Sequence, residues 1–338
     1  MSKVLFLASF VALALALPCL ASAAPQSPGG ELQAAIARAG ELRGKAGDFM
    51  AEAYFPGEWI VAEALYAEAG RINAGGAGDA AAAFDMAANS FASILRLTIP
   101  LYAQAREDEI MMVRDGLVAA GARASFPELM GLADRAALAA LDLYEAGDYY
   151  SARDSAAEAY AMFQILETTF GAWQTRREII RRGFIDYARD NYERAEAVIG
   201  DAVQAYLAGE FPAAMENAIE AQARYFLVLT AGWAAVAERS FSMARAERYA
   251  AVEARANVAA RVVFEEADLF YETATDSIRM EYYREAAELF AEAAVLYAYA
   301  RVSTLERRRL AAEAIMEANR RIEERIRAAR GAGQISEE

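Results

Sequence analysis

The sequence lacks histidine altogether, and its 338 residues include one cysteine, seven prolines and only two lysines. Without imidazole, the chain has no Ser–His or Cys–His nucleophile pair and no histidine ligand for a metal. An excess of 49 acidic over 34 basic residues gives a net charge of −15, which repels nucleic acid and anionic membrane surfaces. These absences exclude the most familiar catalytic sites and predict that nucleic acid is not a partner.

The N-terminal segment has the pattern of a secretory signal peptide. Lys3 precedes an apolar run over residues 4–17, and small residues follow at 20–24. A basic start, an apolar stretch of about 7–15 residues and an A-x-A-like site are typical of such signals. The run is shorter than the roughly 20 apolar residues of a spanning helix. We predict that residues 1–23 are a signal peptide cleaved after Ala23, that the chain is exported to the periplasm or cell envelope, and that no stable membrane span remains. A retained N-terminal anchor is the alternative.

Cys19, the only cysteine, lies inside this segment. Pro18 directly precedes it, whereas a lipoprotein site needs a small residue there, so lipidation at Cys19 is not expected. Cleavage after Ala23 leaves the mature chain without cysteine and therefore without disulfides. The stability of the exported chain must then come from packing.

The remainder of the sequence predicts an all-α protein. Ala, Glu, Arg and Leu dominate after residue 31 at helical spacing, and a strand-like alternation of polar and apolar residues is not evident. We expect a flexible lead-in over residues 24–30, a helical repeat domain over 31–330 and a disordered tail over 331–338.

The helical region contains an internal repeat of four helical hairpins. In each, a first helix ends in a turn of the form Gly-acid-aromatic-x-x-Ala. Small and large apolar residues recur in the second helix at steps of 4, 3 and 4, which mark one helix face. The first turn lacks the aromatic residue, and the fourth has Glu281 in place of the glycine. Phe55-Pro56 and Phe126-Pro127 are expected to begin the first helices of two repeats. The four repeats are expected around residues 55–96, 126–170, 188–230 and 260–302.

The second of these turns resembles the tetratricopeptide repeat, in which a Gly-Asp-Tyr-x-x-Ala turn joins two antiparallel helices. Gly147, Asp148, Tyr149 and Ala152 match that signature, and the third turn matches it with conservative changes. The resemblance covers about half of the chain and implies tandem antiparallel helix pairs. The period of 62 to 72 residues is about twice the 34 of that family. We therefore expect long hairpins, arranged as an α-solenoid or an elongated bundle. The alanine-rich and tyrosine-rich composition is similar to that of exported repeat proteins of spirochaete envelopes.

Aromatic residues near the turns and connectors are the candidates for an interaction surface. Tyr and Trp combine an apolar body with a polar group, so they suit either a binding surface or the rim of a core. For the two tryptophans, packing of helix against helix is the competing interpretation. The candidate residues are Tyr149, Tyr150, Trp173, Tyr225, Trp233, Tyr282 and Tyr283.

No catalytic, cofactor or metal site is predicted. The acidic runs at 107–109 and 265–266 are consecutive in sequence, so their side chains point to different sides of a helix and do not converge on one ion. The glycine-rich loop at 73–78 lacks the Gly-Lys-Ser/Thr ending of a phosphate loop and is interpreted as the long turn of the first repeat.

These features predict a non-enzymatic exported scaffold that mediates protein–protein interaction in the periplasm or cell envelope, with a partner of unknown identity. The alternative is a carrier or binding protein for an apolar small molecule held between helical hairpins. A hydrolase that uses two carboxylates ranks third, because no such pair stands out.

Overall fold

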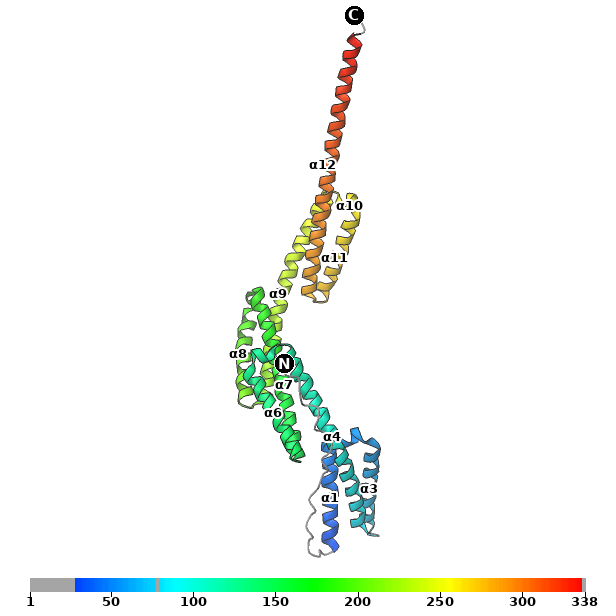
Figure 1. Cartoon of the computed structure of the whole chain (residues 1–338), viewed down its shortest axis with the longest axis vertical. Coiled ribbons are helices and arrows are strands. Elements are labelled where there is room, and N and C mark those ends of the chain that lie inside the picture. The colour runs from blue at the N-terminus through cyan, green and yellow to red at the C-terminus, as the bar shows by residue number, and fades with distance from the viewer. Residues whose placement is uncertain (1–27, 77–78, 336–338) are drawn as a thin grey trace. The chain divides into compact units, whose positions relative to one another are not determined.

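The computed structural model describes residues 28–76 and 79–335, so the predicted signal peptide lies outside the described residues. Helix makes up 92% of the described residues, and no strand occurs among them, which confirms the all-α class (Figure 1). None of the helices in these residues combines the length and the apolar character needed to cross a bilayer.

The described chain divides into two compact units, where the sequence predicts one repeat domain. The first unit contains the described residues up to Glu109 together with Gly147–Arg153. In it, three helices lie side by side and share a core of alanine and aromatic residues (Figure 1). These three helices and the short helix between the first two are α1 (Pro28–Asp48), α2 (Ala51–Tyr54), α3 (Pro56–Gly75) and the first part of α4 (Ala80–Ala119). We call them the first group.

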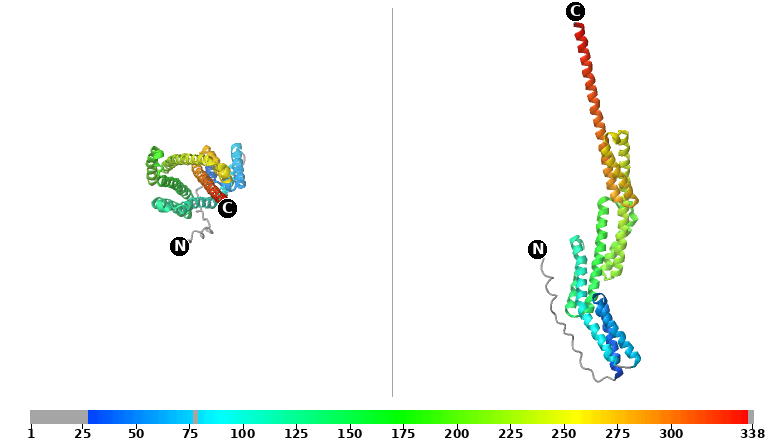
Figure 2. Two further views of the ribbon diagram at one scale, coloured as in Figure 1. Left: turned by 90° about the horizontal axis from the view of Figure 1, so that it is seen from above. Right: turned by 90° about the vertical axis from the view of Figure 1, so that its right-hand side faces the viewer.

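The second unit, residues 110–146 and 154–338, contains three further groups of the same kind. Each group takes the end of one long helix, a one-turn helix, a helix of 19 residues and the start of the next long helix. A long helix therefore serves two groups in succession. Figure 2 shows α8 beside α9, and α11 beside α12.

The second group consists of the end of α4, α5 (Ala122–Ser125), α6 (Pro127–Glu145) and the part of α7 (Tyr149–Arg182) that follows Arg153. The third consists of the end of α7, the 3₁₀ helix η1 (Ile185–Tyr187), α8 (Arg189–Leu207) and the start of α9 (Phe211–Glu253). The fourth consists of the end of α9, α10 (Ala256–Ala259), α11 (Arg261–Arg279) and the start of α12 (Tyr283–Ile335).

In each group, the link between the first helix and the next full-length helix, which we call the corner, has the same form. One residue in the left-handed conformation ends the long helix, a single helical turn follows, and a residue with non-helical backbone angles then leads into the next helix. Pro56 and Pro127 begin α3 and α6, as predicted, because the missing N–H of proline costs nothing in the first turn of a helix. The left-handed residues are Met50, Gly121, Gly183 and Arg255.

The hairpin turns lie where the sequence places them. Gly147 and Gly209 have φ of 81° and 78°, and Glu281 takes the same left-handed conformation at 61°. In the first group the left-handed residue is Gly76, with φ of 63°, two positions before Gly78, the glycine of the predicted motif. The acid of the second turn, Asp148, accepts a hydrogen bond from the amide of Ser151 at the start of α7.

The repeated alanine face of the second helices forms the core. Ala214, Ala218, Ala221 and Tyr225 have no exposed surface, and the corresponding face of α12 is equally buried. Small residues at this seam allow close approach of the helices, and the large residue fills the space further along. At the chain end, α12 continues to Ile335, past the predicted end of the helix at 330, and α1 begins at Pro28, inside the predicted lead-in.

Candidate functional site

Two of the candidate surface residues are part of the core. Tyr225 has 0% exposure and Trp233 has 8%. The Trp233 ring packs edge-on against Phe184, with 5.7 Å between centroids, and the Arg182 guanidinium lies 4.2 Å from its centre. In this structure both rings hold helices together and present little surface to a partner.

Trp173 is half-buried and packs within the second group. Its ring stacks on Phe170 at 5.7 Å, meets Phe126 at 6.0 Å and carries the Arg177 guanidinium at 4.7 Å. The packing interpretation therefore describes both tryptophans, although Trp173 is only half-buried.

Tyr149 and Tyr150 belong to the first unit, and both are half-buried. The Tyr150 ring meets Phe49 edge-on at 5.3 Å and lies under the cations of Arg153 and Lys45. Burial, together with the nearby carboxylate of Asp48, raises the pKa of Tyr150 to about 12. Tyr150 is thus a packing residue with a neutral hydroxyl.

Tyr282 and Tyr283 lie at the turn before α12. Tyr282 is 58% exposed, the largest exposed fraction among the seven candidates, and Tyr283 is half-buried against the core of the fourth group. Tyr282 is therefore the candidate that the structure leaves most accessible.

A feature that the sequence analysis missed is an Arg–carboxylate pair repeated in all four groups. In each pair an arginine near the end of a long helix bonds an acid 20 residues later on the following helix. The first and third pairs are bidentate, with contacts of 2.5 and 3.0 Å, so two N–H groups of one guanidinium meet both carboxylate oxygens. The pairs are Arg43–Glu63, Arg114–Asp134, Arg176–Glu196 and Arg248–Asp268.

In the third and fourth groups a buried tyrosine joins the pair. The Tyr225 hydroxyl donates to Glu196 at 2.5 Å, and the Tyr297 hydroxyl donates to Asp268. In both cases the tyrosine lies 29 residues after the acid. Phe163 stands at that separation from Asp134 in the second group, so its ring fills the same space without a hydroxyl.

The carboxylate at the centre of the third network is held in its charged form. Burial by itself raises the pKa of Glu196, but hydrogen bonds from Arg176 and Tyr225 and the charge of Arg176 more than offset this and lower it. The same contact acts in the opposite direction on Tyr225, whose pKa is raised by burial and by donation to Glu196. Both groups therefore keep one protonation state near neutral pH, which suits a structural strap between helices.

A constant separation in the sequence could have revealed these pairs. Each arginine precedes an acid by 20 residues, and the left-handed residue of the hairpin turn follows the same arginine by 33. The separations hold in all four groups, whereas the long helices differ in length. The equivalent positions run from Arg43 to Gly76, Arg114 to Gly147, Arg176 to Gly209 and Arg248 to Glu281.

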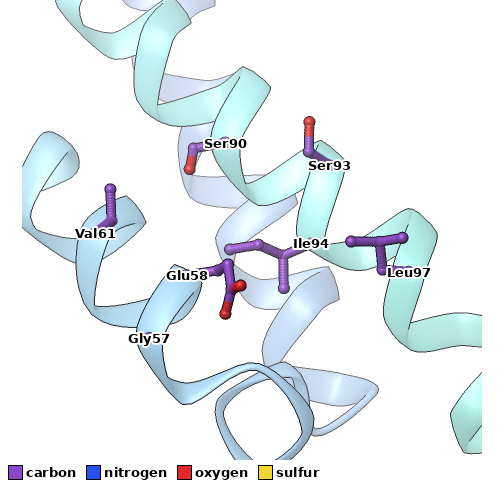
Figure 3. Close-up of a pocket in the computed structure, with 7 residues that line it drawn as sticks. All are labelled: Gly57, Glu58, Val61, Ser90, Ser93, Ile94 and Leu97. Carbon is purple, nitrogen blue, oxygen red and sulfur yellow. The ribbon is translucent and has the colours of Figure 1, made fainter.

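One hollow of about 370 Å³ lies in the first group, between α3 and α4 (Figure 3). Val61, Ile94 and Leu97 supply apolar side chains to its lining, and Glu58 adds a carboxylate. The facing sides of α3 and α4 carry small residues here, which leaves the space open to solvent. The remaining lining residues are Gly57, Ser90 and Ser93.

Within the described residues, no group of three or more Asp, Glu, His or Cys side chains is placed to hold a metal ion. The tandem packing of helices agrees with the resemblance noted from the turns, and membership of the tetratricopeptide family stays a prediction. No family of known proteins, no curated protein and no solved structure matches the chain.

Proposed function

We propose that the protein is a non-enzymatic helical scaffold that binds another protein after export to the periplasm or cell envelope. One observation supports this function above others. On α12, Val295, Tyr299 and Val302 are 63%, 62% and 56% exposed. Their spacing of 4 and 3 residues places them in one row, on the side of the helix opposite to its buried face.

The row on α12 has the properties of a recognition surface. Its three side chains stand on a helix that is fixed from below by the buried rings of Phe290 and Tyr297. Apolar anchors at i, i+4 and i+7 on a rigid helix match the way in which helices dock into apolar grooves. A partner that offers such a groove gains the burial of an aromatic anchor with little loss of side-chain entropy.

The test uses the mature chain as bait in an extract of the cell envelope, followed by reconstitution with the purified partner. Replacing Val295, Tyr299 and Val302 by Ser should weaken direct binding at least tenfold and leave thermal unfolding unchanged. A matched control changes two apolar residues on another exposed face, Val262→Ser and Leu269→Ser on α11, which are 78% and 64% exposed. Equal loss in both variants, or binding that survives the α12 change, contradicts the proposal.

The site of action is tested separately. Fractionation of cells should recover the chain, shortened by the signal peptide, from the periplasm or the envelope. A full-length chain recovered with the cytoplasm contradicts export.

The hollow between α3 and α4 favours a second function, the binding of an apolar small molecule. Its volume of about 370 Å³ falls within the range of about 300–1,000 Å³ for ligand sites. Native mass spectrometry of the purified chain should then show a retained ligand, which Ser93→Met removes by filling the hollow. Ala82→Met, about three turns away on α4, is the matched control and should retain the ligand. A chain that carries no added mass contradicts this function.

A further inference from the structure

The hollow between α3 and α4 combines an apolar lining with a single carboxylate (Figure 3). Glu58 is the one charged residue among those that line it. Val61 and Leu97, on opposite helices, are 56% and 54% exposed, so a bound molecule would cover apolar surface that now faces water. Ligand sites combine such a lining with a few polar groups that fix orientation. The charge that a ligand of this hollow carries therefore depends mainly on Glu58.

Glu58 differs from the other two acids of α3. Glu63 pairs with Arg43, and Glu68 pairs with Arg71. Among the residues that the structure describes, the side chain of Glu58 has neither an ion-pair partner nor a hydrogen-bond partner. A negative charge beside the apolar lining is therefore available to a ligand.

The helix dipole explains why an acid is favoured at Glu58, but it does not cancel the charge. Glu58 lies in the first turn of α3, where the N–H groups carry a partial positive charge of about 0.5, against the full negative charge of the carboxylate. Arg96 is not among the lining residues, and it stands about 100° around α4 from Leu97. The net charge of −15 has the same sign as Glu58. The hollow therefore favours a cation over an anion.

Exposed apolar side chains continue along α4 on both sides of the hollow. Met86 and Leu101 are 59% and 45% exposed. Together with Ser90, Ser93 and Leu97 of the lining they recur at steps of 4, 3, 4 and 4, so all five lie on one side of the helix. A molecule with an apolar chain longer than the hollow can therefore extend along α4 and remain on apolar surface.

We infer that the hollow binds an amphiphilic organic cation, with its apolar chain against Val61 and Leu97 and its charged head group at Glu58. An anionic amphiphile would place like charges together. A neutral apolar molecule would cover the carboxylate without giving it a partner, which is unfavourable. The inference rests on the proposed binding of an apolar small molecule and adds the charge of that molecule.

The test compares three probes that share an octyl chain, namely octyltrimethylammonium, octanol and octyl sulfonate. Their binding to the purified chain, stripped of any retained ligand, is measured by isothermal titration calorimetry below the concentrations at which they form micelles. The buffer contains 0.15 M salt, which screens charges beyond about 8 Å. The cation should bind more tightly than octanol, and at least tenfold more tightly than the sulfonate, because attraction to the carboxylate becomes repulsion. Ser93→Met should abolish the binding of all three.

Glu58→Gln should bring the affinities for the cation and octanol to within about twofold of each other and retain the binding of octanol. Glu31→Gln is the matched control, because Glu31 is also an exposed acid in the first turn of a first-group helix and does not line the hollow. It should keep the preference for the cation. Equal binding of the three probes, a preference that Glu58→Gln leaves intact, or one that both variants lose equally overturns the inference and leaves the small-molecule function standing. A chain that binds no probe overturns both.

Discussion

The second and third groups both contain a large aromatic ring near the corner, but the ring comes from different positions in the two groups. In the second group the large ring comes from the long helix, as Phe170, and the corner residue after the left-handed glycine is Ala122. In the third group the corner residue is Phe184, and the facing position on the long helix is Gly232. Each core therefore contains a large ring, but a helix supplies it in the second group and the corner itself supplies it in the third.

The second and third groups also differ in the residues around the Arg–carboxylate pair. The second group places Phe163 where the third places Tyr225, and only the tyrosine reaches the carboxylate of the Arg–acid pair. In the second group the carboxylate of Asp134 instead binds a second guanidinium, that of Arg123, at 2.5 Å. A buried hydroxyl and an additional surface cation are thus alternative ways to satisfy the same acid.

The largest expected effect comes from Gly232→Ala, which tests the corner of the third group. A Cβ added there would lie 2.2 Å from Cδ2 and 2.8 Å from Cβ of Phe184, so the backbone itself must shift. Overpacking of about 3 kcal/mol exceeds the gain in helix propensity of about 1 kcal/mol, and we expect a net loss of about 2 kcal/mol in the free energy of unfolding. Gly171→Ala is the control, because its Cβ meets only the tip of Gln222, at 3.0 Å.

The clash can be separated from other causes by removing Phe184. In a Phe184→Ala background, Gly232→Ala should stabilise the chain by about 1 kcal/mol, because only the helix propensity remains. Chemical denaturation of the wild type, the two single variants and the double variant completes the cycle. If Gly232→Ala lowers the unfolding free energy equally in both backgrounds, the clash with Phe184 is not the cause of the loss.

The next largest effect is expected from removing the Tyr225 hydroxyl, which the third group has and the second group lacks. Tyr225→Phe makes the third group resemble the second and removes a hydrogen bond to a charged acceptor, so we expect a loss of about 1.5 kcal/mol in unfolding free energy. The exposed Tyr299 provides the control, since Tyr299→Phe removes a hydroxyl without a buried partner. Indistinguishable denaturation midpoints for the two variants would show that the buried hydroxyl contributes no stability.

The sequence predicts a structural feature when the residues that form it are neighbours in the chain, and fails when they are far apart. The left-handed turn at Gly147 and the proline at the start of α6 are local signals, and the structure confirms both. The strap between Arg176 and Glu196 joins two half-buried residues of common types, and in the sequence only their recurring separation distinguishes them. The contact of the Phe184 ring with Gly232 joins residues 48 positions apart. A contact over that separation leaves no periodic pattern in the sequence from which it could be predicted. The candidate tyrosines near the turns were chosen by type, and type does not tell a buried Tyr225 from an exposed Tyr282.

A smaller effect is a dependence of stability on pH in the third group. The folded-state pKa of Glu196 lies below its ordinary value, so the network contributes stability above about pH 4.3 that is lost as pH falls through the folded pKa. Glu196→Gln should abolish this contribution, and the difference in unfolding free energy between wild type and variant should shrink between about pH 6 and about pH 3. Other carboxylates are common to both chains and cancel. A difference that stays constant over this interval would mean that Glu196 titrates alike in the folded and unfolded chain.

The smallest effect extends the comparison to the fourth group, where Glu281 holds the left-handed position that Gly147 and Gly209 hold in the others. Relief of left-handed strain is worth about 1–2 kcal/mol, while the greater freedom of glycine in the unfolded chain costs about 0.5–1 kcal/mol. Glu281→Gly should therefore raise the unfolding free energy by about 0.5 kcal/mol. Glu292→Gly, eleven residues on and in the interior of α12, should lower it by about 1 kcal/mol. The opposite signs follow from backbone conformation alone, because both changes remove one exposed carboxylate, and two changes of the same sign in denaturation would contradict the strain at residue 281.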